Sequence, residues 1–263
     1  MKYAYALLGV LALSAPAMAA EPPGAGQLSP EPDLTDPAKT YDSCILLSKS
    51  HPDQALELAS KWGAIGGGEG AQHCRALALI GLNDFGQGAL ELEQLAQKSK
   101  GTIGLRANLL EQAGQAWLMQ GEPTHAYNAQ TAGLKLVTPD MPQYVRLLVD
   151  RAATLAEGAK FKEAIVDLDA ALEQKPDNAD ALAFRATARR NLKQNDLALA
   201  DAEAAVKADP RNVNARLERA NMYKLLGRIN DARRDWVLIP QLAPDSDAAK
   251  AARADMERAD VKP

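Results

Sequence analysis

Apolar and small residues recur at three- and four-residue steps across positions 155–176, on both sides of a break at Gly158. Such steps place side chains on one face of an α-helix, whereas glycine interrupts the pattern. Proline ends a helix because it has no N–H for the next hydrogen bond of the ladder. The stretch is therefore predicted to form two amphipathic helices joined by a short turn, the second of which ends at Pro176.

This pattern returns at a step of 34 residues between positions 145 and 244. The alanines in it would let paired helices approach closely, and larger residues such as Leu155 and Phe161 would fill the remaining space. A fixed period of about 20–50 residues is the signature of stacked helical repeats. Five columns of identical residues keep the step: Arg151, Arg185 and Arg219; Ala152, Ala186 and Ala220; Ala164, Ala198 and Ala232; Asp167, Asp201 and Asp235; Pro176, Pro210 and Pro244.

The third copy has the most complete set of positions: Ala220, Tyr223, Gly227, Ala232, Trp236 and Pro244. This order of small, large, glycine, alanine, aromatic and proline residues resembles the tetratricopeptide repeat. The second copy is looser, with Arg189 at the large apolar position and Lys193 at the glycine position. The resemblance implies an all-α fold, namely a right-handed α-solenoid of helix-turn-helix repeats with a C-terminal capping helix.

The resemblance extends more weakly toward the N-terminus, so that six repeats would form one solenoid over residues 41–245. A closing helix is predicted at 246–260, started by a Ser246 cap, because the end repeat of a solenoid needs a polar cover. The predicted parts of the solenoid are degenerate repeats at 41–140, a short insertion around 141–144, and clear repeats at 145–178, 179–212 and 213–246.

The first residues have the pattern of an export signal. Lys2 precedes an apolar run at 3–13, Pro16 breaks the run, and small residues follow at 17–19. The run falls well short of the roughly 20 residues that span a bilayer, so stable membrane insertion is not expected. A signal peptide cleaved after Ala19 is predicted, and with it a periplasmic or equivalent exported location.

Residues 20–40 carry five prolines with almost nothing apolar between them. Such a segment cannot bury enough surface to offset the entropy lost on ordering. It is predicted to be a flexible tether.

The charge balance limits the classes of partner. A net charge of −4 and an aromatic content of 5% argue against nucleic-acid binding, which uses basic surfaces and stacking rings. Residues 185–234 nevertheless hold twelve Lys and Arg against six Asp and Glu. This excess is either ordinary solenoid surface with some arginines in internal pairs, or a positive patch for an acidic peptide, lipid head group or polysaccharide.

Catalytic and cofactor motifs are not found in the sequence. It holds no Gly-x-Ser-x-Gly, His-Glu-x-x-His, Walker or Cys-x-x-Cys pattern, and the glycine-rich residues 65–70 precede no Gly-Lys-Ser/Thr. His51, His73 and His125 lie far apart and are interpreted as turn or surface residues. No enzyme activity, metal or cofactor is predicted. A cell-envelope enzyme or a thiol-active accessory protein with a site between repeats remains the alternative.

Two cysteines, Cys44 and Cys74, are predicted to form a disulfide. Exported chains tend to pair their cysteines, and these two lie in the expected first helices of consecutive repeats, which stack side by side. Closing the 30-residue interval would stabilise the fold by roughly 3–4 kcal/mol on the chain-entropy estimate.

The arginine and aspartate columns are predicted to pair. Each aspartate follows its arginine by sixteen residues, on the second helix of the same copy. Bidentate, partly buried pairs within or between neighbouring repeats would make these arginines structural. Trp117 and Trp236 are expected in the core, whereas Trp62 ends a helix and is harder to place.

The resemblance also implies a function and its surface. Tetratricopeptide proteins commonly hold a peptide in a concave groove lined by first helices, so the chain is expected to be a non-enzymatic scaffold for another protein or peptide. Val149, Ala153 and Phe184 stand where the carboxylate-clamp subset has polar residues, which argues against that device. Basic residues toward the C-terminal end favour a partner with acidic side chains. The predicted groove residues are Asn108, Gln112, Gln115, Arg146, Asp150, Glu157, Asp180, Thr187, Arg190, Asn191, Asn214, Asn221 and Lys224.

Overall fold

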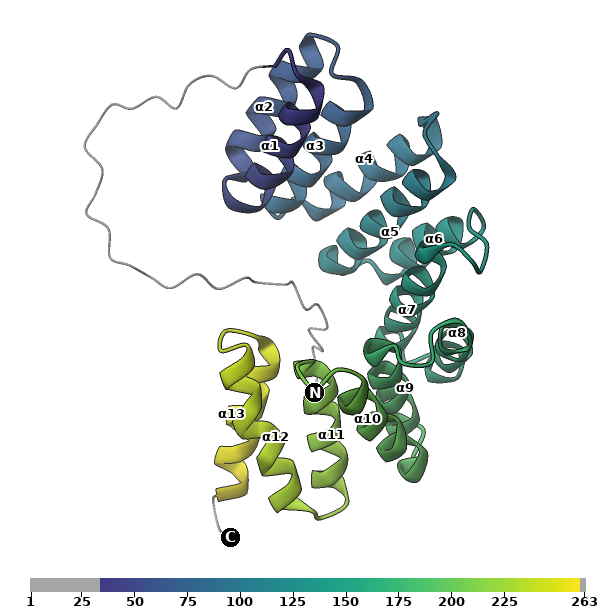
Figure 1. Ribbon diagram of the computed structural model, residues 1–263, viewed down its shortest axis with the longest axis vertical. Helices are drawn as coiled ribbons and strands as arrows, with labels where there is room; N and C mark the ends of the chain where they lie inside the picture. The colour runs from purple at the N-terminus through teal and green to yellow at the C-terminus, as the bar shows by residue number, and fades with distance from the viewer. Residues whose placement is uncertain (1–33, 261–263) are drawn as a thin grey trace, which may run out of the picture. The chain divides into compact units, whose positions relative to one another are not determined.

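The computed structural model describes residues 34–260, which form thirteen α-helices and no strand (Figure 1). The all-α prediction is confirmed for this part of the chain. The helices divide into two compact units at the boundary between Asp84 and Phe85, and each unit is described by itself. The predicted signal peptide at 1–19 and most of the predicted tether lie outside the described residues.

The N-terminal unit consists of α1 (Pro37–Ser50), α2 (Pro52–Ala64) and α3 (Gly68–Gly81). Helix α1 packs against both α2 and α3. The predicted C-terminal bound of the tether, residue 40, is wrong, because residues 37–40 already belong to α1. The Asp36 side chain accepts hydrogen bonds from the backbone N–H groups of Ala38 and Lys39, and Pro37 suits the first helical position.

The C-terminal unit repeats one arrangement of paired helices. First helices α5, α7, α9 and α11 each pack against the second helix that follows, and successive first helices also contact one another. The closing helix α13 packs against α11 and α12. The bounds are α4 (Phe85–Lys98), α5 (Ile103–Gln120), α6 (Pro123–Leu134), α7 (Pro142–Glu157), α8 (Phe161–Gln174), α9 (Ala179–Asn191), α10 (Asn195–Ala208), α11 (Val213–Leu225), α12 (Ile229–Leu242) and α13 (Asp247–Asp260).

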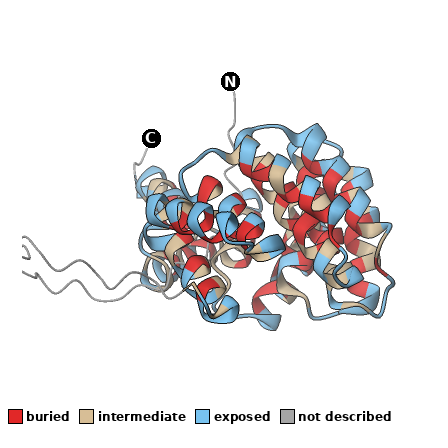
Figure 2. Cartoon of the chain, turned by 90° about the horizontal axis from the view of Figure 1, so that it is seen from above, coloured by how far each residue is buried: buried red, intermediate tan, exposed pale blue. Residues whose placement is uncertain are grey.

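Small residues make the close helix pairing possible. The alanines of both repeat columns are buried between the paired helices, together with Leu168 and Trp236. Figure 2 shows buried residues where helices face one another and exposed residues on their outer sides. The polar caps also recur. The side chains of Asn178 and Asn212 accept hydrogen bonds from the N–H groups of Ala181 and Ala215, which starts α9 and α11 in the same way.

The predicted insertion before α7 lengthens this helix. Met141 is the N-cap and Pro142 the first helical residue, so α7 has 16 residues where α9 has 13. At the other end of the chain, the predicted cap is present, because the Ser246 hydroxyl accepts a hydrogen bond from the N–H of Ala249 at 3.1 Å.

Two predictions about aromatic residues and histidines need correction. Trp117 is only partly buried, and its indole N–H donates to Glu93 at 2.9 Å while its ring stacks on His125. His73 is not a surface residue, because it is buried in α3 with its Nδ1 2.6 Å from the Tyr41 hydroxyl. Trp62 packs on glycines, since a Cβ at Gly67 would lie 2.7 Å from the indole.

The turn between paired helices requires a left-handed residue in each clear repeat. Ala159, Lys193 and Gly227 occupy this position with φ values of 56°, 63° and 75°. Only glycine adopts this conformation without a steric cost from its side chain. Lys193, at the position where the repeat usually has glycine, therefore leaves the second turn strained.

We expect Lys193→Gly to stabilise the protein by about 0.5–1 kcal/mol, since the relief of strain exceeds the added chain entropy of the unfolded state. Gly227→Ala should destabilise it by about 1 kcal/mol or more at the equivalent turn. Urea unfolding of both variants measures the two effects. Equal effects of the same sign would show that the backbone conformation does not decide stability here.

Candidate functional site

The arginine and aspartate columns form a ladder of bidentate ion pairs inside the clear repeats. Arg151 donates through Nε and Nη2 to both oxygens of Asp167, at 2.8 and 2.7 Å. Arg185 bonds Asp201 in the same way at 2.9 and 2.8 Å. Arg219 bonds Asp235 at 2.8 Å through each nitrogen. The predicted pairing is confirmed, and each pair joins the first helix of a repeat to its second.

Additional arginines strengthen the ladder. Arg189 and Arg216 donate to Asp201 and Asp235 at 2.8 and 2.7 Å, so each of these carboxylates accepts hydrogen bonds from two guanidinium groups. The three ladder aspartates are buried, and such charges are stable inside a protein only when paired. Four of the twelve cations of residues 185–234 are therefore internal structure rather than part of a free positive patch.

The predicted groove residues lie on the first helices, and many of them bridge one first helix to the next. We call this set the first-helix face. Arg146 on α7 donates to both oxygens of Glu111 on α5, at 2.8 and 2.9 Å, and to Asn108 at 2.8 Å. Gln115 on α5 donates to Asp150 on α7 at 2.9 Å. The repeat-to-repeat contact along this face is thus polar.

Similar bridges continue toward the C-terminus. Arg190 on α9 donates to both oxygens of Glu218 on α11, at 2.7 and 3.1 Å. Lys224 on α11 donates to Asp255 on α13 at 2.7 Å. These two cations were expected to attract acidic side chains of a partner. Because both are paired within the chain, the expectation of an acidic partner loses its support.

Several of the other predicted residues of the first-helix face contact residues of their own helix. Asn191 donates from its side chain to the backbone oxygen of Thr187, whose hydroxyl donates to Ala183, and Asn221 lies 3.5 Å from Glu218. Gln112 also has a contact within the chain. Asn214 is partly exposed at the start of α11. Sequence reasoning missed Glu111, Glu218 and Asp255, because these partners do not recur at the repeat step.

The electrostatics of the face centre on Asp150. The pKa of this carboxyl is raised to about 7, mainly by burial. The hydrogen bond from Gln115 acts in the opposite direction and lowers the pKa. The charges of Glu111 and Asp180 raise the pKa further, and Arg146 offsets them in part. Burial also raises the pKa of Glu157. The middle of the face therefore holds carboxylates whose charged forms are destabilised.

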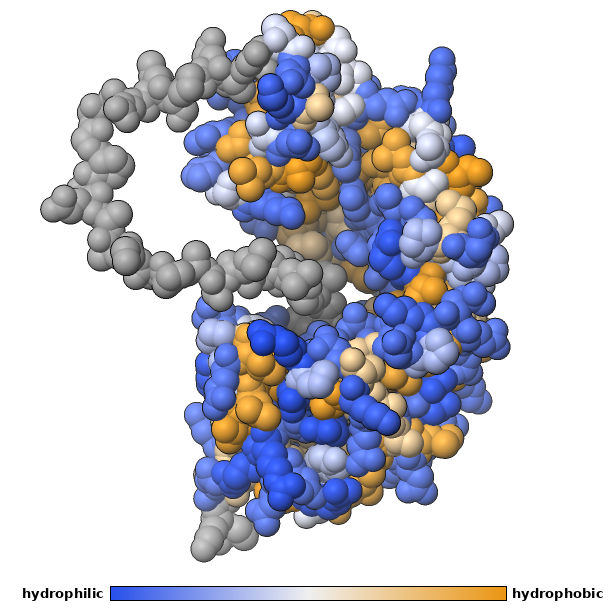
Figure 3. Space-filling view, viewed as in Figure 1, coloured by the Kyte–Doolittle hydropathy of each residue, from blue (hydrophilic) through white to orange (hydrophobic). Residues whose placement is uncertain are grey.

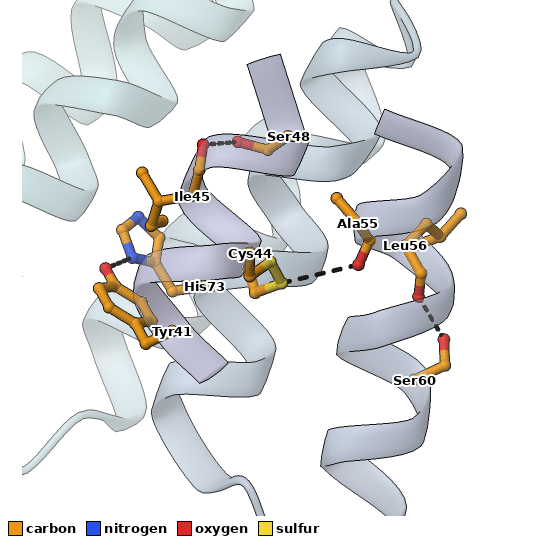
Figure 4. The surroundings of a disulfide bond; sticks show 9 residues. Tyr41, Cys44, Ile45, Ser48, Ala55, Leu56, Ser60 and His73 are labelled. Atoms are coloured by element: carbon orange, nitrogen blue, oxygen red, sulfur yellow. Dashed lines mark hydrogen bonds between the residues drawn. A yellow bond between two sulfur atoms is a disulfide. The ribbon is translucent and has the colours of Figure 1, made fainter. Parts of the chain in front are cut away.

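The predicted disulfide is present in the N-terminal unit (Figure 4). It joins Cys44 on α1 to Cys74 on α3, with the Cα atoms 5.8 Å apart, within the range that a disulfide requires. Both cysteines are fully buried in a core with Ala55, Leu58 and Ala78. The bond therefore ties two helices through the centre of this small unit, and it leaves no free thiol.

Neither a metal site nor a membrane segment is found in the part of the chain that the structure describes. Between residues 34 and 260, no three His, Cys, Asp or Glu side chains gather so that they could hold a metal ion. Within the same range, no helix combines the length and the apolar character needed to cross a bilayer.

Comparisons with known proteins bear on the fold. No family model matches the chain. Sperm-associated antigen 1 of Mus musculus is 36% identical over 98 residues, which are 37% of this chain and span only 11% of the length of that relative. A thermophilic tetratricopeptide-repeat protein of Thermus thermophilus, TTC0263, superposes with a TM-score of 0.58 at 15% identity, over 72% of this chain and 99% of its own.

Two further solved structures have a similar fold. MamA from Desulfovibrio magneticus has a TM-score of 0.53 at 18% identity, covering 68% of this chain and 97% of its own. YrrB, described as a tetratricopeptide-repeat protein with an unusual peptide-binding site, has a TM-score of 0.52 at 17% identity, covering 68% and 90%. The described part of the chain has the all-α fold of tetratricopeptide-repeat solenoids. At these identities the solved structures establish the fold of the solenoid and nothing of its partners.

Removal of one ladder carboxylate should be costly. Asp235 is 1% exposed and accepts from both Arg216 and Arg219. We expect Asp235→Ala to lower the free energy of unfolding by about 3–5 kcal/mol, because two partly buried guanidinium groups lose their partner. Lys250→Ala is the control, since its pair with Asp247 has side chains 69% and 57% exposed and should contribute less than about 1 kcal/mol. Urea unfolding tests both, and similar losses would contradict a structural ladder.

Asp150 should make stability depend on pH. Its pKa is raised from 3.8 to about 7, so between these values the folded state binds more protons than the unfolded state. The contribution of Asp150 to the free energy of unfolding is therefore greatest below pH about 4 and is lost as the pH rises toward 7. Asp150→Asn should gain stability relative to the wild type between pH 4 and 8 in urea unfolding. A constant difference over this range would show that Asp150 ionises normally.

Proposed function

We propose that this chain is an exported, non-enzymatic scaffold that holds a peptide or protein segment along its first-helix face. The observation that carries the proposal is the row of polar side chains that successive first helices present. Packed helices lie about 8–10 Å apart and an extended peptide rises about 3.3 Å per residue, so each first helix faces about three residues of such a peptide. The constant spacing of the first helices therefore matches the constant spacing of residues along an extended peptide.

Several features support the proposal against its alternatives. The ladder arginines are occupied inside the repeats, which leaves the amides and carboxylates of the first-helix face as the groups that a partner would meet. The disulfide favours an oxidising compartment, in agreement with the export signal expected at 1–19. A thiol-active role has less support, because both cysteines are buried and joined to each other.

A site-specific cross-link tests the proposal. Benzoylphenylalanine, a photoreactive residue, would replace Asn214 on the first-helix face, and in a matched variant it would replace Val166, which is 67% exposed on α8. Irradiation in an extract of exported proteins should give a discrete cross-linked partner from position 214 and none from position 166. A partner captured only from position 166 would place binding on the second helices and refute the proposal.

A further inference from the structure

In the middle part of the first-helix face, carboxylates outnumber the cations that could pair with them. Arg146 and Arg190 are both held in bidentate pairs, with Glu111 and Glu218. The surface of the region labelled α9–α13 is predominantly hydrophilic in the visible view (Figure 3). Toward α13, Asp255 is neutralised by two cations, since it accepts from Arg258 as well as Lys224. The imbalance is therefore confined to α7 and α9.

Three carboxylates on these two helices form no ion pair with the described residues, and only Asp150 lies within reach of a cation, the guanidinium of Arg146. Asp150 and Asp180 accept hydrogen bonds only from neutral amides, those of Gln115 and Asn212, at 2.9 and 2.7 Å. Glu157 makes no hydrogen bond or ion pair with the described part of the chain. Amide donors orient a carboxylate without neutralising it, so no ion pair offsets the negative charge of this part of the face, to which Asp150, with its pKa of about 7, contributes only in part near neutral pH.

These three carboxylates share one surface. Asp150 and Glu157 are seven residues apart on α7, which places them on the same side of the helix two turns apart. Asp180 lies in the first turn of α9, the neighbouring first helix, and its charge reaches Asp150 strongly enough to raise the pKa of that group. The repulsion of Asp150 by Glu111 and Asp180 is a cost that the folded chain carries while the face is empty.

A cation on the partner would remove this cost. A lysine or arginine side chain placed between α7 and α9 would form charge-assisted hydrogen bonds with these carboxylates, two of which, Asp150 and Asp180, neighbouring amides already hold in position. An extended segment directs alternate side chains to one face, about 7 Å apart, so two basic residues in an i, i+2 arrangement would span the distance from one first helix toward the next. Asn191 at the end of α9 and Asn214 at the start of α11 carry further side-chain amides, which could bond the backbone of an extended segment.

We propose that the α7–α9 part of the first-helix face, built on Asp150, Glu157 and Asp180, binds a basic segment of an extended polypeptide through its lysine or arginine side chains. This inference rests on the proposed function, because it takes the first-helix face as the binding surface. It differs from the sequence-based expectation of an acidic partner, which required Arg190 and Lys224 to be free.

Random dodecapeptides displayed on phage are the probe. The full chain is used for selection at low salt, and the selected peptides are sequenced and measured by fluorescence anisotropy. Lysine and arginine should be enriched at least about twofold over the input library, and aspartate and glutamate depleted. Replacing the lysines and arginines of a selected peptide by glutamate should weaken its binding by about tenfold or more.

Matched variants locate the effect. The triple variant Asp150→Asn, Glu157→Gln and Asp180→Asn should lose about tenfold in affinity for the selected basic peptides. The control variant Glu163→Gln, Glu173→Gln and Asp196→Asn removes the same number of charges from exposed positions on second helices and should change the affinity less than about twofold. Circular dichroism establishes that both variants are folded.

The outcomes separate the two proposals. Selected peptides that are acidic or neutral, but cross-link to benzoylphenylalanine at position 214, would overturn the basic partner and leave the binding face intact. Basic peptides that bind both triple variants equally well would overturn the assignment to α7 and α9. Selection of no peptide at all would contradict both the face and its charge preference.

Discussion

The bidentate pair between a first-helix arginine and a second-helix aspartate is the contact on which the clear repeats depend. Alanines bring the two helices close, and this closeness buries the aspartates and most of the surface of each ladder arginine. A guanidinium fork that meets both oxygens of a carboxylate satisfies these charges with a fixed geometry. The pair therefore sets the angle and register of the two helices, which hydrophobic packing between small residues would leave poorly specified.

A second layer of polar contacts depends on this first one. Because each first helix is fixed against its second helix, side chains such as Arg146 and Arg190 reach partners on the adjacent first helix. These bridges use up the cations of the first-helix face and leave the carboxylates of α7 and α9 uncompensated. The distribution of charge available to a partner is thus a consequence of how the repeats hold together.

The sequence predicted the features that recur at the repeat step and the single disulfide, but it missed the polar bridges that do not recur. The ladder was predictable because both of its partners keep the step of 34 residues, and the disulfide because the chain has only two cysteines. The bridge from Arg190 to Glu218 was not predictable, since the equivalent positions 156 and 184 hold Ala and Phe. The start of α1 was missed because the prolines before it obscured the Asp36 cap.

A double-mutant cycle on Arg151 and Asp167 tests the central claim most directly, because Asp167 forms no other ion pair in the described structure. Both alanine variants and the double variant would be unfolded in urea. A structural ladder predicts a coupling energy of about 2 kcal/mol or more, above the 0–1 kcal/mol of exposed pairs. A coupling energy below about 0.5 kcal/mol would contradict it and return the paired arginines to the list of groups that a partner could contact.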